Sequence, residues 1–140
     1  MSNAKFRTDF AKLLKKAGDN ADTVVRHTAL TLQSEMVARS PVATGRFKGN
    51  WQAGIKSINT DTSTADDKSG SAAIGRTRAT LSWWRAGMTI NLTNSLPYAR
   101  VLEYGRANGN PGSLQAPQGV VRLTLQNFRQ SLAKALKGLA

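Results

Sequence analysis

Apolar residues recur every three or four positions along the first part of the chain. The spacing holds from residue 5 to residue 39 and predicts an amphipathic helix. Its apolar face comprises Phe6, Phe10, Leu13, Ala17, Ala21, Val25, Thr28, Leu32 and Met36. Gly18, Asp19 and Asn20 suit helix caps, so two consecutive helices are the alternative. One unbroken helix would run about 50 Å, longer than a domain of this mass, and a projecting apolar face needs another chain to cover it.

The pattern changes to alternation after Pro41, which is expected to end the helix. From residue 47 to residue 56 the period is two, which predicts a half-buried strand. Phe47, Gly49, Trp51, Ala53 and Ile55 fall on its inner face, and Lys48, Asn50, Gln52 and Lys56 fall on its outer face. A second alternating segment at residues 88–93 predicts another strand, with Met88, Ile90 and Leu92 pointing inward.

Three further helices are indicated by weaker patterns. Residues 75–86 predict a short helix, and residues 94–97 start another that Gly105 ends. The aromatic and aliphatic side chains of this second short helix, Tyr98, Leu102 and Tyr104, are expected to pack it onto the sheet. A C-terminal helix is predicted from the apolar spacing of Val121, Leu125, Phe128, Leu132 and Leu136.

Two segments rich in polar, small or glycine residues, 59–73 and 106–117, are predicted to be mobile loops. The whole chain of 140 residues then forms a single α+β domain. A long N-terminal helix and a C-terminal helix pack on a small antiparallel sheet. Two strands seldom stand alone in water. A third strand is therefore expected from residues 106–118, from the first loop, or from a neighbouring subunit.

The charge balance narrows the classes of partner. Twenty Lys and Arg residues face eight Asp and Glu residues, for a formal net charge of +12. Such an excess favours contact with polyanions or with an acidic protein surface, although it can also serve solubility alone. Candidate contacts to nucleic acid are Lys12, Lys15, Lys16, Arg76, Arg78 and Arg85. No apolar run approaches the roughly 20 residues that span a bilayer, so no membrane contact is expected.

Few residues offer catalytic chemistry. The chain has no cysteine and one histidine, His27, which lies beside the apolar face of the first helix. Asp66 and Asp67 are adjacent but fall in the polar loop, which is not expected to hold a fixed geometry. Glu103 lies close in sequence to two arginines and is interpreted as one half of an ion pair that fixes the adjacent glycine hinge or joins two subunits. We therefore expect no enzyme activity, cofactor, metal site or small-molecule substrate.

Trp83 and Trp84 are the remaining prominent side chains. Beside Arg78 and Arg85 they could stack on nucleic-acid bases. Paired large aromatic residues more often divide between the core and an interface, where tryptophan and arginine anchor protein contacts. The second interpretation is preferred.

Three segments in a fixed order resemble a known family. They are "SPVATGRFKGNW" (40–51), "NLTNSLPYARVLEYG" (91–105) and "QAPQGVVRLTLQNF" (115–128). Each resembles a segment of the small tail components of tailed bacteriophages, the tail-completion or head–tail joining proteins. The resemblance spans about residues 24–128. Ala43 departs from it, since an acidic residue is frequent there, and this could remove a contact to Arg46. The long polar loop at 59–73 is a second departure.

The resemblance implies a structural part at the head-proximal end of a phage tail. It also implies a homo-oligomeric ring, commonly a hexamer, and contacts with other tail or neck proteins. The excess of positive charge adds proximity to DNA as a hypothesis. The protein would then belong to the virion and would assemble in the bacterial host cytoplasm. The interface or structural candidates are Arg46, Trp51, Trp83, Trp84, Tyr98, Glu103, Tyr104 and Gly105. A small basic nucleic-acid-binding protein is the alternative.

Overall fold

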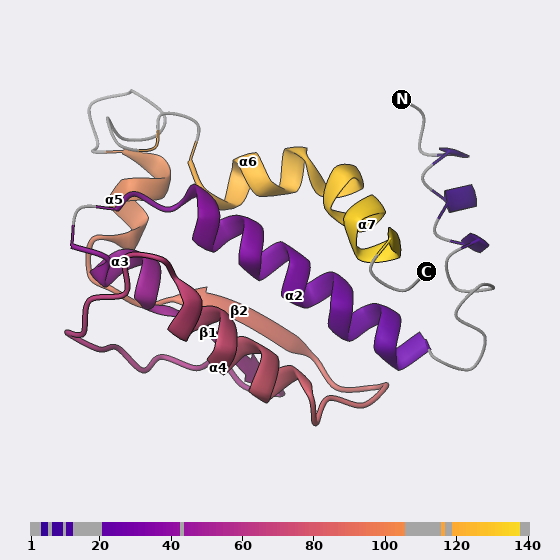
Figure 1. The fold of residues 1–140 in the computed structure, drawn as a ribbon, viewed down its shortest axis with the longest axis horizontal. Helices are drawn as coiled ribbons and strands as arrows, with labels where there is room; N and C mark the ends of the chain where they lie inside the picture. The colour runs from indigo at the N-terminus through magenta and orange to yellow at the C-terminus, as the bar shows by residue number, and fades with distance from the viewer. Residues whose placement is uncertain are drawn as a thin grey trace.

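The computed structural model describes residues 4–5, 7–9, 11–12, 21–42, 44–105, 116 and 119–137 (Figure 1). Its elements are α2 (Ala21–Arg39), α3 (Arg46–Gly49), β1 (Trp51–Ile55), α4 (Ser71–Leu81), β2 (Ile90–Asn94), α5 (Ala99–Tyr104), α6 (Val121–Gln126) and α7 (Phe128–Lys137). Helices around a small antiparallel sheet confirm the α+β class predicted from the sequence.

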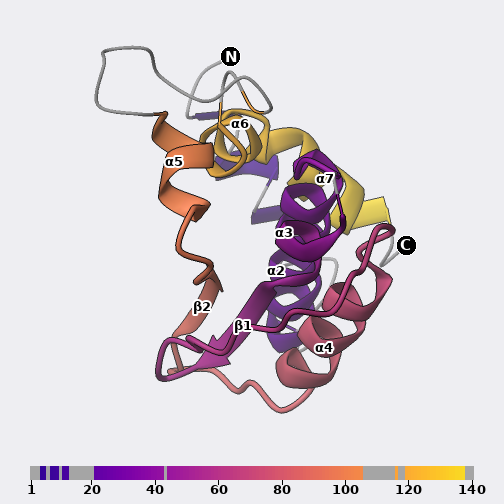
Figure 2. The same cartoon turned by 90° about the vertical axis from the view of Figure 1, so that its left-hand side faces the viewer.

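The long helix α2 lies at the centre of the fold. It packs against α4 on one side and against α6 and α7 on another, and α4 also packs on β1 (Figures 1 and 2). Because neighbours cover it from several directions, its fully buried positions do not follow the single face predicted from spacing. They are Val24, Ala29, Gln33, Met36 and Val37, whereas Val25, Thr28 and Leu32 are only half-buried.

A fully buried glutamine is the main departure from the predicted apolar face. Gln33 has no exposed surface, and its Nε2 donates to the Gln52 carbonyl oxygen at 3.2 Å and to Thr77 Oγ1 at 3.3 Å. These hydrogen bonds join α2 to β1 and to α4. They satisfy the NH₂ group of the buried amide, whereas Gln33 Oε1 has no hydrogen-bond partner among the described residues.

The N-terminal part of the predicted first helix is described only in pieces. The described residues between 4 and 12 are helical, and continuous helix is described from Ala21 onward. Phe6, Phe10 and residues 13–20, which include the expected cap residues, lie outside the described part of the chain. The helix that the structure does describe ends at Arg39, two residues before Pro41, as predicted.

The first strand is shorter and more buried than predicted. Residues 46–49 form the short helix α3 rather than strand, so β1 begins at Trp51. All five residues of β1 are buried, which corrects the expectation of a half-buried strand. The loop after β1 covers its second face: Asn50 donates to and accepts from the backbone of Ser63, at 2.9 and 2.7 Å, and Gln52 Nε2 donates to the Asp61 carbonyl oxygen at 3.4 Å.

The polar loop ends earlier than predicted, because α4 starts at Ser71. Asp67 Oδ1 accepts from Gly70 N–H at 3.1 Å and Oδ2 accepts from Ala73 N–H at 3.0 Å. Asp67 therefore holds a defined position as a cap of α4, contrary to the expectation for this aspartate. The mobility predicted for the loop remains a prediction, and most of the second predicted loop, 106–117, lies outside the described residues.

The two strands pair antiparallel, with Trp51 opposite Asn94 and Ile55 opposite Ile90. The inward side chains of the second segment are as predicted: Met88 and Ile90 pack on one apolar cluster and Leu92 packs on another. Within the described residues the sheet has two strands. The expected third strand is not found in the first loop, and residues 106–115 are not described.

The C-terminal segment forms two helices rather than one, with Asn127 between α6 and α7. The break changes the phase of the apolar face. Leu132 is buried as predicted, but Leu125 is 59% exposed and Thr124 is buried in its place. Thr124 Oγ1 accepts a hydrogen bond from Arg39 at 3.0 Å, which fastens α6 to the end of α2.

Two apolar clusters form the core. The larger one joins α2, the α3–β1 turn, α4 and the residues before α6 through Met36, Val37, Phe47, Trp51, Ala73, Leu96, Ala116 and Val120. The smaller one consists of Ala29, Ile55, Leu81 and Trp84 and lies toward the other end of α2. The family-like segments at 40–51 and 91–105 therefore both contribute to the larger cluster.

Candidate functional site

The junction between α5 and α6 is built around one carboxylate. Glu103 Oε2 accepts from the backbone N–H of Val120 at 2.6 Å and of Val121 at 2.9 Å. Its Oε1 accepts from the backbone N–H of Arg122 at 2.9 Å and lies 3.3 Å from that residue's Nε. The N-terminal N–H groups of a helix lack partners within the helix and favour negative charge. Glu103 thus caps α6 from a different helix, and the Arg122 guanidinium also donates to the Glu103 carbonyl oxygen.

The pKa of Glu103 reflects two opposed effects. Burial, the largest single contribution, raises the pKa of this carboxyl. The hydrogen bonds from the backbone N–H groups of Arg122, Val121 and Val120, together with that from the Arg122 side chain, outweigh burial, so the pKa lies below its ordinary value of 4.5. Glu103 is therefore an ionised structural group at neutral pH.

One face of α5 is exposed to solvent and carries three aromatic or aliphatic side chains. Tyr98, Val101 and Tyr104, spaced three residues apart, are 38%, 39% and 58% exposed. On the opposite side, Ala99 and Leu102 pack against the larger core cluster. Figure 2 shows α5 at the edge of the molecule, beside α6.

The two tyrosines do not pack α5 onto the sheet as expected, because Leu102 and Ala99 occupy that side of the helix. The Tyr98 ring lies 6.1 Å from that of Phe47, and the Arg122 guanidinium lies 5.3 Å from the centre of the Tyr104 ring. Both rings are thus oriented by one contact and retain free surface. Gly105 ends α5 with a φ of +77°, a conformation that glycine adopts without strain.

The three tryptophans have different environments. Trp51 is 3% exposed and its Nε1 donates to Ser40 Oγ at 2.7 Å. Trp84 is 7% exposed and its Nε1 donates to the Met88 carbonyl oxygen at 2.8 Å, whereas Trp83 is 49% exposed. Trp51 and Trp84 are therefore core residues, and Trp83 has a surface available for a partner.

Arg46 is the first residue of α3 and lies within the first family-like motif, 40–51. Its backbone N–H donates to Thr44 Oγ1 at 3.2 Å, and its buried Nε has no hydrogen-bond acceptor among the described residues. Ala43, where the family often has an acid, lies outside the described residues. The loss of a contact to Arg46 that Ala43 suggests therefore remains a prediction.

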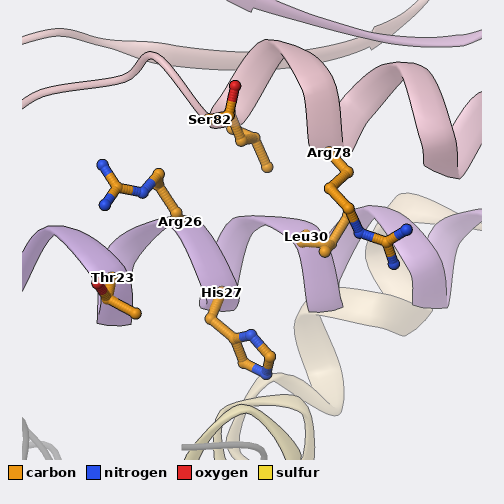
Figure 3. Close-up of a pocket in the computed structure, with 7 residues that line it drawn as sticks. Thr23, Arg26, His27, Leu30, Arg78 and Ser82 are labelled. Carbon is orange, nitrogen blue, oxygen red and sulfur yellow. The ribbon is translucent and has the colours of Figure 1, made fainter.

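A basic groove lies between α2 and the C-terminal end of α4 (Figure 3). The sequence alone did not reveal this groove. It has a volume of about 290 Å³ and is lined by Thr23, Arg26, His27, Leu30, Arg78, Leu81 and Ser82. One Arg26 NH group donates to the Trp84 carbonyl oxygen at 2.9 Å. Helical spacing could have placed Arg26 and His27 near Leu30. It could not have indicated that α4 lies alongside.

The six cations proposed for nucleic-acid binding do not form one described surface. Arg76 donates to the Gly49 and Trp51 carbonyl oxygens and to Gln52 Oε1, so it serves the fold. Arg85 donates to the Ser82 and Trp84 carbonyl oxygens. Lys15 and Lys16 lie outside the described residues. Arg78 is the member that lines the groove.

The described part of the chain shows neither a metal-binding cluster nor a membrane-spanning helix. No group of three or more His, Asp or Glu side chains there is arranged to hold a metal ion. No helix there has the length and apolar character needed to cross a membrane.

Comparison with known proteins gives one match. The family described as "Bacteriophage HK97-gp10, putative tail-component" matches residues 4–105, which is 102 of the 140 residues. The match contains the first two family-like motifs, and the third, at 115–128, lies beyond it. The chain matches no curated protein and no solved structure at significant similarity.

Proposed function

The chain belongs to the HK97-gp10-like family of bacteriophage tail components, and we propose that it completes the tail or joins it to the head at the head-proximal end. The family match over residues 4–105 is the observation that carries this proposal. A tail component is a structural part of the virion, and assembly would take place in the host cytoplasm.

Ring-type self-assembly is the second part of the proposal. A ring needs heterologous interfaces, in which one patch of a subunit meets a different patch of the next. The exposed face of α5 (Tyr98, Val101 and Tyr104) supports this idea, because aromatic side chains held by one contact suit the centre of an interface. Hexameric order and contacts with tail-tube or neck proteins belong to the same proposal.

The test is the mass of the particle formed with tail-tube protein. We expect a complex that contains several copies of this chain per tube end, measured by light scattering or native mass spectrometry. A Val101→Asp variant places a charge on the exposed α5 face and should lose the complex while its thermal unfolding is unchanged. Ala79→Asp, an exposed position on α4, is the matched control. No association with tail-tube or neck protein, together with the absence of the protein from purified virions, would overturn the proposal.

Nucleic-acid binding is the second candidate, and the net charge of +12 favours it. Titration with duplex DNA across a salt series separates the two functions. Micromolar or tighter affinity near 150 mM salt with a steep salt slope would favour a DNA-binding role. Weak binding with a shallow slope would favour the structural role.

A further inference from the structure

We propose that the basic groove between α2 and α4 receives the carboxylate of Asp66 from a second copy of this chain. The inference rests on the ring assembly proposed above and names one contact within it. The acid and the groove lie at opposite ends of α4, so the contact joins two different patches, as a heterologous ring interface requires.

The groove combines positive charge with an apolar lining. Arg26, His27 and Arg78 carry basic nitrogen atoms, and Leu30 and Leu81 supply the apolar part. The Ser82 hydroxyl donates to the Ala79 carbonyl oxygen and points away from α2 (Figure 3). Arg78 is exposed, and its guanidinium has no hydrogen bond or ion pair within the described part of the chain. A guanidinium beside apolar surface binds a carboxylate more strongly than one surrounded by water. The chemistry fits one acidic side chain better than an extended phosphate backbone, which suits a longer groove or stripe.

The described acids differ in their availability. Asp67 and Glu103 cap helices, and Glu35 pairs with Arg39 at 3.3 Å. Asp61 and Asp66 are both exposed, and neither carboxylate has a hydrogen bond or ion pair among the described residues. Of the two, Asp66 is the one next to α4. It stands in the loop directly before the capping residue, and the hydrogen bonds of that residue fix the position of the neighbouring backbone.

Asp66 cannot reach the groove of its own chain. Asp66 precedes the N-terminal end of α4, whereas Arg78, Leu81 and Ser82 lie at its C-terminal end. An 11-residue helix is about 16 Å long, beyond the reach of an aspartate side chain. Each copy thus presents an acid at one end of α4 and a basic groove at the other. This is the arrangement that head-to-tail association requires.

Charge repulsion between two copies makes a contact between opposite charges important for association. Two copies that each carry a formal charge of +12 repel one another over the distance that salt permits. Local pairs of opposite charge at the interface offset part of this repulsion. A carboxylate placed against the groove cations supplies such a pair.

Charge reversal tests the contact. Asp66→Arg and Arg78→Glu should each weaken self-association about tenfold or more, measured by sedimentation velocity with and without tail-tube protein. The double variant Asp66→Arg/Arg78→Glu reverses both sides and should recover most of the affinity, which a purely structural role of either residue would not produce. Lys12→Glu, at an exposed described position, is the control for total charge. Both test positions are exposed, and thermal unfolding checks that the variants fold.

Any of the following outcomes would overturn the inference. Single variants that associate like the wild type would show that the groove is not in the interface, while a tail-bound particle in the same experiment would leave the proposed function standing. Failure of the double variant to recover would exclude direct pairing. If Arg78→Glu lost DNA binding but kept self-association, the groove would be a binding site for DNA phosphates instead. A wild type that stays monomeric with and without tail-tube protein would exclude the contact but not a single-copy role in the tail.

Discussion

Glu103 and Arg122 join two helices that are separated by a long connection. The carboxylate on α5 pairs with the guanidinium at the start of α6, 3.3 Å from Oε1 to Nε, and the same oxygen accepts the Arg122 backbone N–H at 2.9 Å. The Glu103 side chain is 12% exposed and that of Arg122 is 36% exposed. This pair holds the start of α6 beside α5, and the Arg122 guanidinium also lies over the ring of Tyr104 on the exposed α5 face.

Removal of the carboxylate should loosen α6. In Glu103→Ala, three backbone N–H groups and one guanidinium lose an acceptor, so the free energy of unfolding should fall by about 1–3 kcal/mol. Urea denaturation measures the loss, and hydrogen exchange should be faster for the amides of Val120, Val121 and Arg122. Asp66→Ala removes an exposed carboxylate and should change stability by no more than about 0.5 kcal/mol. Equal effects of the two substitutions would contradict the capping role.

The same carboxylate should make stability depend on pH. The folded-state pKa of Glu103 lies below 4.5, so its contribution is present above that pH and is lost as the pH falls through the lowered pKa. Glu103→Gln cannot titrate at this position. The difference in unfolding free energy between the wild type and Glu103→Gln should be constant near neutral pH and should narrow in acid. A difference that stays constant down to the pH of acid unfolding would argue against this prediction.

The sequence predicted the elements better than it predicted their contacts. Periodicity located both strands and α2, and the start signal near Pro97 with the stop at Gly105 located α5, because all these signals are local in the sequence. It misplaced the buried face of α2, since burial of Gln33 depends on Gln52 and Thr77 from elements distant in the chain. Arg122 was missed as the partner of Glu103 for the same reason. The two residues are 19 positions apart, and only the fold brings them together.

Loss of one hydrogen bond should destabilise the larger core cluster. Trp51→Phe removes the N–H that donates to Ser40 Oγ at 2.7 Å and leaves space beside Phe47, whose ring centre lies 5.9 Å away. We expect a loss of about 1–3 kcal/mol in unfolding free energy. Trp83→Phe makes the same chemical change at a half-exposed position and should cost no more than about 0.5 kcal/mol. Thermal and chemical denaturation of both variants provide the comparison, and similar losses would contradict the assignment of Trp51 to the core.

Two glycines at the start and middle of α4 should respond to alanine in opposite directions. Gly70 has a φ of +78°, and an added Cβ would lie 2.1 Å from Val37 Cγ1, so Gly70→Ala forces both a strained backbone and a shift of the Val37 side chain. Gly75 lies inside α4 with nothing within 4 Å of an added Cβ. Gly75→Ala should therefore stabilise the protein by about 0.5–1 kcal/mol through helix propensity, whereas Gly70→Ala should destabilise it by more than that amount. Denaturation midpoints of the two variants decide the matter: a stable Gly70→Ala protein would mean that α4 does not approach α2 as closely at Val37 as the structure shows.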